Sequence, residues 1–174
     1  MSKTIAMFII LLLGLAAPMA ALADCPNNLL VNPGFEPPYT TPIPGKENCF
    51  IAHGWSAWYA EGSREETSQG YRHAPEYKFS IPQDIPYNRV RSGATAQQWF
   101  KTFANFEAGI WQQVSNVTPG VRYRFTLWGM SWSCDNEKTS NCRGARSGNP
   151  SPMRFRIGID PTGGLSPWGA SVVW

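Results

Sequence analysis

The sequence has few of the side chains on which metal centres and acid–base catalysis depend. Only two histidines, His53 and His73, occur in 174 residues, and charged residues make up 16% of the chain. No Cys-x-x-Cys pair is present, so the ligand spacing typical of a structural zinc site is missing. The formal net charge is +3, which is too weak to indicate a nucleic-acid partner.

Catalytic motifs are missing as well. No Gly-x-Ser-x-Gly elbow, phosphate-binding loop or dinucleotide-binding motif occurs. Glycosidases need two carboxylates held about 5–10 Å apart, whereas Glu61, Glu65 and Glu66 share one polar loop that is poorly suited to fix such a geometry. We therefore expect no enzyme within these residues. A catalytic domain beyond Trp174 is the alternative, and the chain would then be an accessory domain of a larger secreted hydrolase.

No apolar run is long enough to span a membrane, which takes about 20 residues. The longest, Ile5 to Ala17, has 13 residues. Lys3 precedes this run and Ala21-Leu22-Ala23 follows it, which is the pattern of a secretory signal peptide. We expect residues 1–23 to be the signal peptide, with cleavage after Ala23, and residues 24–174 to form one secreted domain.

All four cysteines lie in the part of the chain that would be exported. An even number of cysteines in such a chain favours disulfides. Cys134 and Cys142 bracket a polar loop and are expected to pair, which by default leaves Cys25 to pair with Cys49. Cys25 also raises the alternative of a lipid anchor, but a small residue normally precedes a lipidated cysteine, and here that residue is Asp24.

The chain lacks a long amphipathic helix, and this absence indicates an all-β fold. Sixteen glycines and 15 prolines separate short apolar stretches, a pattern typical of a β-sandwich or barrel. The polar stretch 61–70 is expected to be a loop. The clearest predicted strands are Ala94–Phe103, Gly109–Val117, Val121–Trp132 and Met153–Ile159. Because the sequence stops inside the apolar run Ser171–Trp174, we expect a truncated domain that lacks its final strand.

Alternation along these strands assigns side chains to two faces. The predicted core face of the third strand carries Val121, Tyr123, Phe125 and Leu127, while its other face carries arginine and tryptophan. Aromatic rings stack on the apolar face of a sugar, and amide or guanidinium groups bind its hydroxyls. The candidate ligand-binding residues are Trp128, Trp132, Trp111, Gln113, Gln97, Trp99 and Arg124. The alternative for each tryptophan is a secondary core beneath loops.

Four arginines favour a second interpretation. Arg122, Arg124, Arg154 and Arg156 alternate with apolar residues on two predicted strands, so they would share an outward face. Such a face could bind an acidic polymer or an acidic neighbouring domain, or could simply be solvated. The alternative function is therefore a structural or adhesive β-sandwich module without a sugar ligand.

Several stretches together resemble one family. NLLVNPGFE, HGWSAW, RSGATAQQWF and GIWQQVSNVTPGVRYRFTLWGMSW resemble, in their order and spacing, the jelly-roll carbohydrate-binding modules of the cellulose- and xylan-binding type, within the galactose-binding-domain-like superfamily. The likeness extends from Asn28 to about Ile159. It implies a jelly-roll β-sandwich and a non-catalytic carbohydrate-binding or related extracellular recognition module. The implied partners are a polysaccharide or glycan and further domains of the same parent chain.

The resemblance also implies a role for the Asn-Pro-Gly-Phe-Glu turn. In such modules this turn buries its phenylalanine and presents oxygen ligands to a structural Ca²⁺. It therefore implies that Phe35 is a core residue and that the Glu36 carboxylate and the Gly34 carbonyl bind calcium. A surface glutamate after a turn is the alternative. Two departures from the family pattern are Pro33, where glycine is frequent, and the missing last strand that would complete the site.

Overall fold

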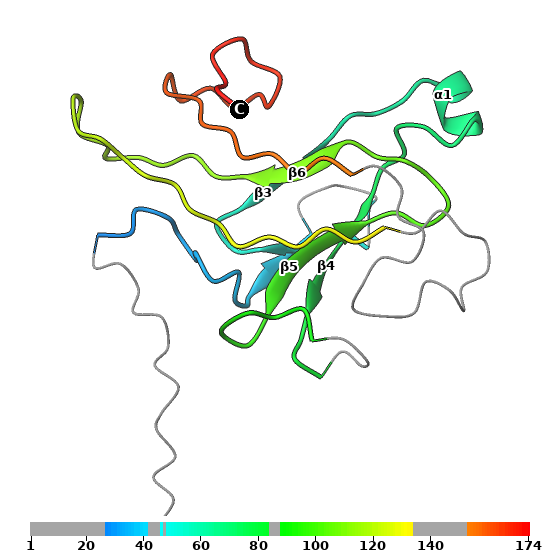
Figure 1. Cartoon of the computed structure of the whole chain (residues 1–174), viewed down its shortest axis with the longest axis horizontal. Coiled ribbons are helices and arrows are strands. Elements are labelled where there is room, and N and C mark those ends of the chain that lie inside the picture. The colour runs from blue at the N-terminus through cyan, green and yellow to red at the C-terminus, as the bar shows by residue number, and fades with distance from the viewer. Residues whose placement is uncertain (1–26, 42–45, 47, 84–87, 134–152) are drawn as a thin grey trace, which may run out of the picture.

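The computed structural model of the chain describes residues 27–41, 46, 48–83, 88–133 and 153–174. The expected signal peptide, Cys25, Cys134 and Cys142 lie outside these ranges. Figure 1 shows the short strands and the single short helix of the described part, which are β1 (Tyr39–Thr40), β2 (Ile51–Ala52), β3 (Ser56–Tyr59), α1 (Arg64–Ser68), β4 (Glu76–Ser80), β5 (Ala96–Phe100) and β6 (Ala108–Trp111). The predicted all-β class is confirmed, and within the described residues no helix is long and apolar enough to cross a membrane.

The strands form three antiparallel pairs, β1 with β2, β3 with β6, and β4 with β5. The β4–β5 register places Tyr77 opposite Trp99, with ring centroids 6.4 Å apart, and such cross-strand aromatic pairs stabilise a sheet. β5 lies inside the predicted strand Ala94–Phe103, and β6 begins one residue before the predicted strand Gly109–Val117 and overlaps its start. Both strands are shorter than predicted.

The core lies where β2, β4 and the β3–β6 pair meet. Its fully enclosed residues include Ile51 and Tyr77, both 0% exposed. The Tyr77 hydroxyl donates to the Trp58 carbonyl at 2.5 Å and lies 3.2 Å from the Gly109 carbonyl, so it ties β4 to both strands of the β3–β6 pair. Phe50 N donates to the Tyr77 carbonyl at 2.8 Å, which joins the chain entering β2 to β4.

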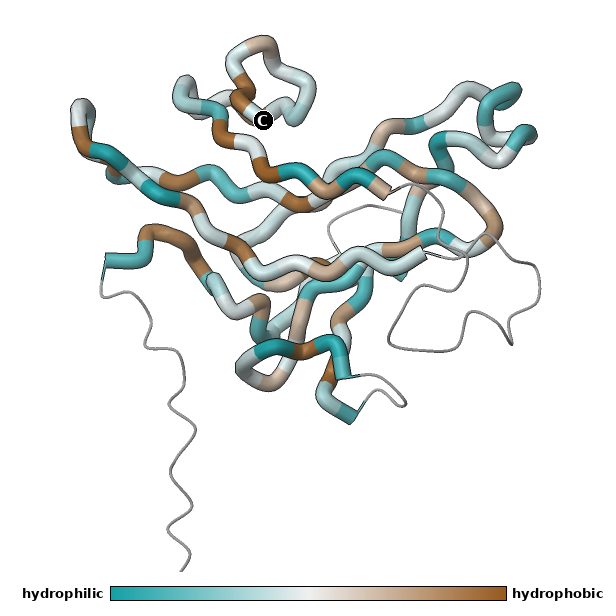
Figure 2. The backbone as a smooth tube through the Cα atoms, viewed as in Figure 1, coloured by the Kyte–Doolittle hydropathy of each residue, from teal (hydrophilic) through white to brown (hydrophobic). Residues whose placement is uncertain are grey.

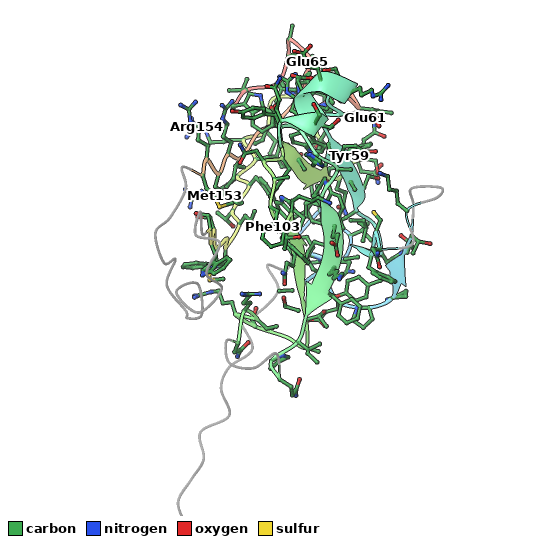
Figure 3. All side chains as sticks on the ribbon, turned by 90° about the vertical axis from the view of Figure 1, so that its right-hand side faces the viewer. Tyr59, Glu61, Glu65, Phe103, Met153 and Arg154 are labelled. Atoms are coloured by element: carbon green, nitrogen blue, oxygen red, sulfur yellow. The ribbon has the colours of Figure 1, made fainter. Side chains whose placement is uncertain are left out.

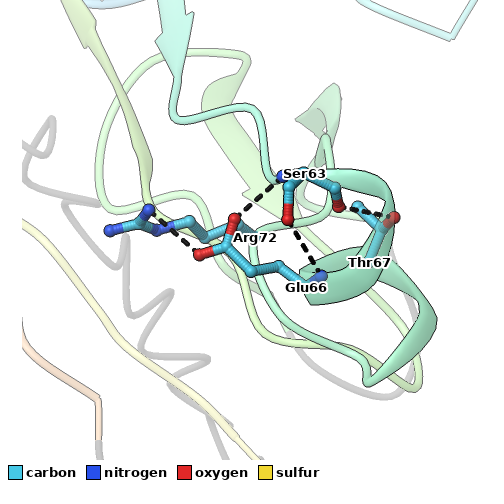
Figure 4. Close-up of polar contacts among 4 residues, drawn as sticks. All are labelled: Ser63, Glu66, Thr67 and Arg72. Carbon is cyan, nitrogen blue, oxygen red and sulfur yellow. Dashed lines mark hydrogen bonds and ion pairs between the residues drawn. The ribbon is translucent and has the colours of Figure 1, made fainter.

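The stretch 61–70, predicted as a loop, contains the five-residue helix α1, so that prediction is wrong there. The helix begins with a capping box. The Ser63 hydroxyl accepts from Glu66 N at 3.2 Å, and the Glu66 carboxylate accepts from Ser63 N at 2.8 Å (Figure 4). Arg72 adds an ion pair to Glu66 at 3.2 Å. The Ser-x-x-Glu signal was present in the sequence, but no apolar periodicity accompanied it.

The two segments with the clearest alternation do not form the predicted strands. Residues 121–133 and 153–158 pair with no other strand. At the end of the second predicted strand, Ile159 forms an isolated antiparallel bridge with Val173. Figure 1 shows 121–133 as an extended segment, and Figure 2 shows alternating hydrophobic and hydrophilic residues along the segment that leads to the C-terminal loop.

The predicted core face of 121–132 is only half correct. Phe125 packs against the core cluster and Leu127 is half-buried. Val121 and Tyr123 are 53% and 45% exposed, which contradicts the prediction for them. Alternation determines which side chains share a face, but it does not determine whether a neighbouring strand and a second layer cover that face.

Removing the Tyr77 hydroxyl should weaken the contact between β4 and the β3–β6 pair. We expect Tyr77→Phe to lower the free energy of unfolding by about 1–2 kcal/mol, because the Trp58 carbonyl loses its hydrogen-bond donor and the contact with the Gly109 carbonyl is lost. Urea titration monitored by circular dichroism measures this change. Tyr71→Phe, at a 50% exposed side chain, is the matched control, and an equal loss in both variants would contradict the assigned role.

The same residue gives an expected pH dependence. Burial raises the pKa of the Tyr77 phenol above its ordinary value of 10.0. The unfolded chain therefore releases this proton at a lower pH than the folded chain does, so the stabilisation is complete below about pH 10 and declines as the pH rises further. In urea titrations between pH 8 and 11, Tyr77→Phe should show a smaller alkaline decline than the wild-type chain.

Candidate functional site

The Asn-Pro-Gly-Phe-Glu turn is held by hydrogen bonds within itself. The Asn32 side-chain oxygen accepts from Glu36 N at 2.8 Å, and its amide nitrogen donates to the Glu36 carbonyl at 2.6 Å. The Trp55 indole N–H donates to the Asn32 carbonyl at 3.0 Å, and the Phe35 and Trp55 ring centroids are 4.8 Å apart. Phe35 packs against the core cluster, as the resemblance implies.

The Glu36 carboxylate extends from this turn to a second turn, at residues 93–95. One carboxylate oxygen accepts from Ala94 N at 2.9 Å and from Thr95 N at 3.5 Å, and the other lies 3.1 Å from the Thr95 hydroxyl. Gly93 has φ +76°, and a Cβ there would overlap the Glu36 carboxylate, so glycine is required at this position. The carboxylate thus fixes the chain that enters β5.

The resemblance implies that the Glu36 carboxylate binds calcium, and in the structure this carboxylate has hydrogen-bond partners within the chain. One oxygen accepts from Ala94 N, and the other lies beside the Thr95 hydroxyl, which is 2.9 Å from the Phe35 carbonyl. Within the described residues no group of three or more histidine, cysteine, aspartate or glutamate side chains could hold a metal ion. Gly34 is exposed. Calcium binding by Glu36 and Gly34 stays a prediction.

Two glutamine side chains form hydrogen bonds with backbone groups of neighbouring segments, as a paired strand would. The Gln112 amide accepts from Val31 N at 2.7 Å and donates to the Val31 and Gly54 carbonyls at 2.9 and 2.7 Å. Gln97 accepts from Ala52 N at 2.9 Å, and its amide nitrogen lies 3.0 and 2.9 Å from the Phe50 and Lys78 carbonyls. Backbone groups therefore occupy the Gln97 amide, which the sequence suggested for sugar binding.

The other predicted ligand residues divide by exposure. Trp99 packs against the core cluster, and Trp111 and Trp132 are half-buried. Gln113 is exposed and donates to the Gly163 carbonyl at 3.1 Å. Trp128 and Arg124 are exposed, so the structure does not gather the seven residues on one open face.

Trp128 is the most open of the predicted tryptophans, with 71% of its surface exposed. The Arg91 guanidinium carbon lies 3.5 Å from the centroid of its ring. At this separation the guanidinium must lie nearly parallel to the ring, because an upright group would overlap it. Arg91 was not predicted, since no local pattern connects it with a residue 37 positions further along the chain. We call these two residues the Arg91–Trp128 pair.

The surface around the extended segments is cationic. Arg122, Arg124, Arg154 and Arg156 are all exposed, and Arg156 lies 6.0 Å from the centroid of the Trp174 ring. Figure 3 shows Arg154 and Met153 on one side of the view, away from Glu65 in α1 and Glu61 just before this helix. Within the described residues the two ion pairs are Arg72–Glu66 and Lys78–Glu76.

Asp160 is the nearest acidic residue along the chain to Arg154 and Arg156. Its carboxylate accepts from Thr162 N at 2.9 Å and from the Thr162 hydroxyl at 2.7 Å, and these bonds hold the pKa of Asp160 below its ordinary value. Within the described residues, neither ion pair joins Asp160 to an arginine.

Cys49 is buried and has no disulfide partner within the described residues, and burial raises the pKa of its thiol. Its predicted partner, Cys25, and the predicted pair Cys134–Cys142 lie outside the described residues, so both disulfides stay predictions.

A scan against protein-family models, a search of the curated proteins and a search of the solved structures each found no match to this chain. The chemistry of the surface is therefore inferred from its own residues.

Glu36→Gln should release the turn at residues 93–95. We expect the free energy of unfolding to fall by about 1.5–3 kcal/mol, because a charged acceptor of several hydrogen bonds is lost and the new amide hydrogens face backbone donors. Amide exchange at Ala94 and Thr95, measured by NMR, should accelerate at least about tenfold through local opening. Glu107→Gln, at an exposed glutamate, is the control. Unchanged amide exchange at Ala94 and Thr95 in Glu36→Gln would contradict the role assigned to the Glu36 carboxylate.

Proposed function

We propose that this chain is an exported, non-catalytic carbohydrate-binding module with a jelly-roll β-sandwich fold. The observation that carries the proposal is the 71% exposure of Trp128. An indole ring left in water loses the apolar burial that normally stabilises tryptophan in a fold. A ligand with a flat apolar face would recover this burial.

Sugar rings have the complementary chemistry. Their C–H face stacks on an indole, and their hydroxyls accept or donate hydrogen bonds to planar polar groups. Arg91 lies against one face of the Trp128 ring, so the ring edge and the opposite face are the surfaces available to a sugar. Guanidinium donors next to an aromatic surface suit a ligand that is apolar on one side and polar at its rim.

The fold supports the same proposal at a coarser level. The antiparallel pairs, the near absence of helix and the docked Asn-Pro-Gly-Phe-Glu turn agree with the family that the sequence resembles. The proposed location is extracellular, from the signal-peptide pattern at residues 1–23. Glu36 serves the fold in this proposal, whether or not a calcium ion binds elsewhere on the chain.

A structural or adhesive module without a sugar ligand is the second candidate. One observation favours it: the extended segment 153–159 exposes Phe155, Ile157 and Ile159 by 48%, 38% and 49%. Exposed apolar side chains of this kind mark contacts with other proteins or domains. A neighbouring domain of a larger secreted hydrolase would cover them and make the chain an accessory domain.

Trp128→Ala provides the decisive test. We expect the wild-type chain to bind at least one polysaccharide on a glycan array, and the variant to lose about tenfold or more in affinity, because stacking of a ring contributes about 1–3 kcal/mol. Isothermal titration calorimetry with the bound polymer measures the loss.

Trp168→Ala is the matched control, because Trp168 is also exposed, at 55%, but packs edge-on against Trp58. Circular dichroism should show that both variants are folded. If a folded wild-type chain binds no glycan, or if Trp128→Ala binds as the wild-type chain does, the second candidate function is preferred.

A further inference from the structure

We propose that the glycan bound at this surface is anionic, a polysaccharide that bears carboxylates, and that the Arg91–Trp128 pair recognises two neighbouring uronate residues of it. This inference rests on the proposed function and specifies its ligand class. Trp128 would stack on one sugar ring through its open face. Arg91, on the other face of the indole, would bind the carboxylate of the next sugar, where the polymer passes the ring edge.

The stacked geometry leaves the Arg91 donors available. A guanidinium that lies flat on an indole contacts it through its face, while its N–H groups point outward in its own plane. Arg91 is exposed and its guanidinium carbon is 3.5 Å from the ring centroid. The stack therefore orders a fork of donors beside the aromatic ring, and this fork matches the two oxygens of a carboxylate.

Within the described residues, neither of the two ion pairs involves Arg91, so no described carboxylate is paired with this fork. The two extended segments add four exposed arginines, and the Asp160 carboxylate that follows them is held by Thr162. A polymer that carries a negative charge on each sugar would find a positive surface beyond the pair, whereas a neutral polymer would leave these charges unused.

The fold holds Arg91 in place. The turn at residues 93–95, two residues after Arg91, is fixed by the Glu36 carboxylate. Val90, on the other side of Arg91, is 9% exposed, so the backbone is anchored on both sides of this arginine. A pre-ordered side chain loses less conformational entropy when it binds a ligand. Glu36 is thus a positioning residue for the proposed site.

The probe is polygalacturonate, and its fully methyl-esterified form is the matched neutral polymer with the same backbone. We expect the wild-type chain to bind the acid form at least about tenfold more tightly than the ester, because charge-assisted paired hydrogen bonds are lost in the ester. Titration calorimetry at constant salt measures both affinities.

Variants separate specific recognition from general attraction between charges. Arg91→Gln and Arg91→Lys should each weaken binding to the acid polymer about tenfold, because lysine keeps the charge but lacks the planar fork. Arg89→Gln, at an exposed arginine two positions away, is the control and should change affinity less than about twofold, as expected for one screened surface charge. All variants should retain the wild-type circular dichroism spectrum.

Each contrary result has a distinct meaning. Equal, Trp128-dependent binding of acid and ester would overturn the carboxylate assignment and leave the carbohydrate-binding module in place. An equal loss in Arg89→Gln, or tighter binding of dextran sulfate than of polygalacturonate, would indicate unspecific attraction of polyanions and also overturn it. If no polymer in the set, nor any glycan on the array, binds through Trp128, both the ligand class and the proposed function fail.

Discussion

The contact between the Glu36 carboxylate and the turn at residues 93–95 connects the parts of this structure that bear on function. The carboxylate accepts from Ala94 N at 2.9 Å and extends from a turn that is itself docked on the core through Phe35 and Trp55. A charged acceptor makes stronger hydrogen bonds than a neutral one, so one side chain fixes two distant turns. This contact also fixes the backbone two residues after Arg91.

Side-chain amides provide a second constraint, because the strand pairs are short. Gln112 binds both the N–H and the carbonyl of Val31, as a neighbouring strand would. Gln97 connects β2 and β4 in a similar way, because its side-chain oxygen accepts from Ala52 N and its amide nitrogen donates to the Lys78 carbonyl. Buried backbone groups must find partners, and here glutamines supply partners that regular ladders would otherwise provide. The core is small, and the proposed ligand surface lies on extended chain outside it.

Local patterns suffice for the class of the fold and for part of its strands. The all-β class follows from the scattered glycines and prolines, β5 lies within a predicted strand, and β6 overlaps the start of another. The role of Phe35 in the core was also implied correctly. The alternation of 121–132 correctly placed Phe125 inward, but Val121 and Tyr123 are exposed, because alternation assigns faces and does not supply a covering layer. The sequence also drew attention to the Glu36 carboxylate, and the structure shows that it accepts from Ala94 N in a distant turn.

What the sequence by itself determined is the class of the fold, the docked turn and the presence of outward tryptophan and arginine, since each depends on residues close together in the chain. The tertiary structure alone decided which of these side chains meet. It enclosed the Gln97 amide, placed Trp99 against the core and left Trp128 open. It also placed Arg91 on Trp128 at 3.5 Å. That contact joins two segments far apart in sequence, and its geometry depends on long-range packing that no local pattern encodes.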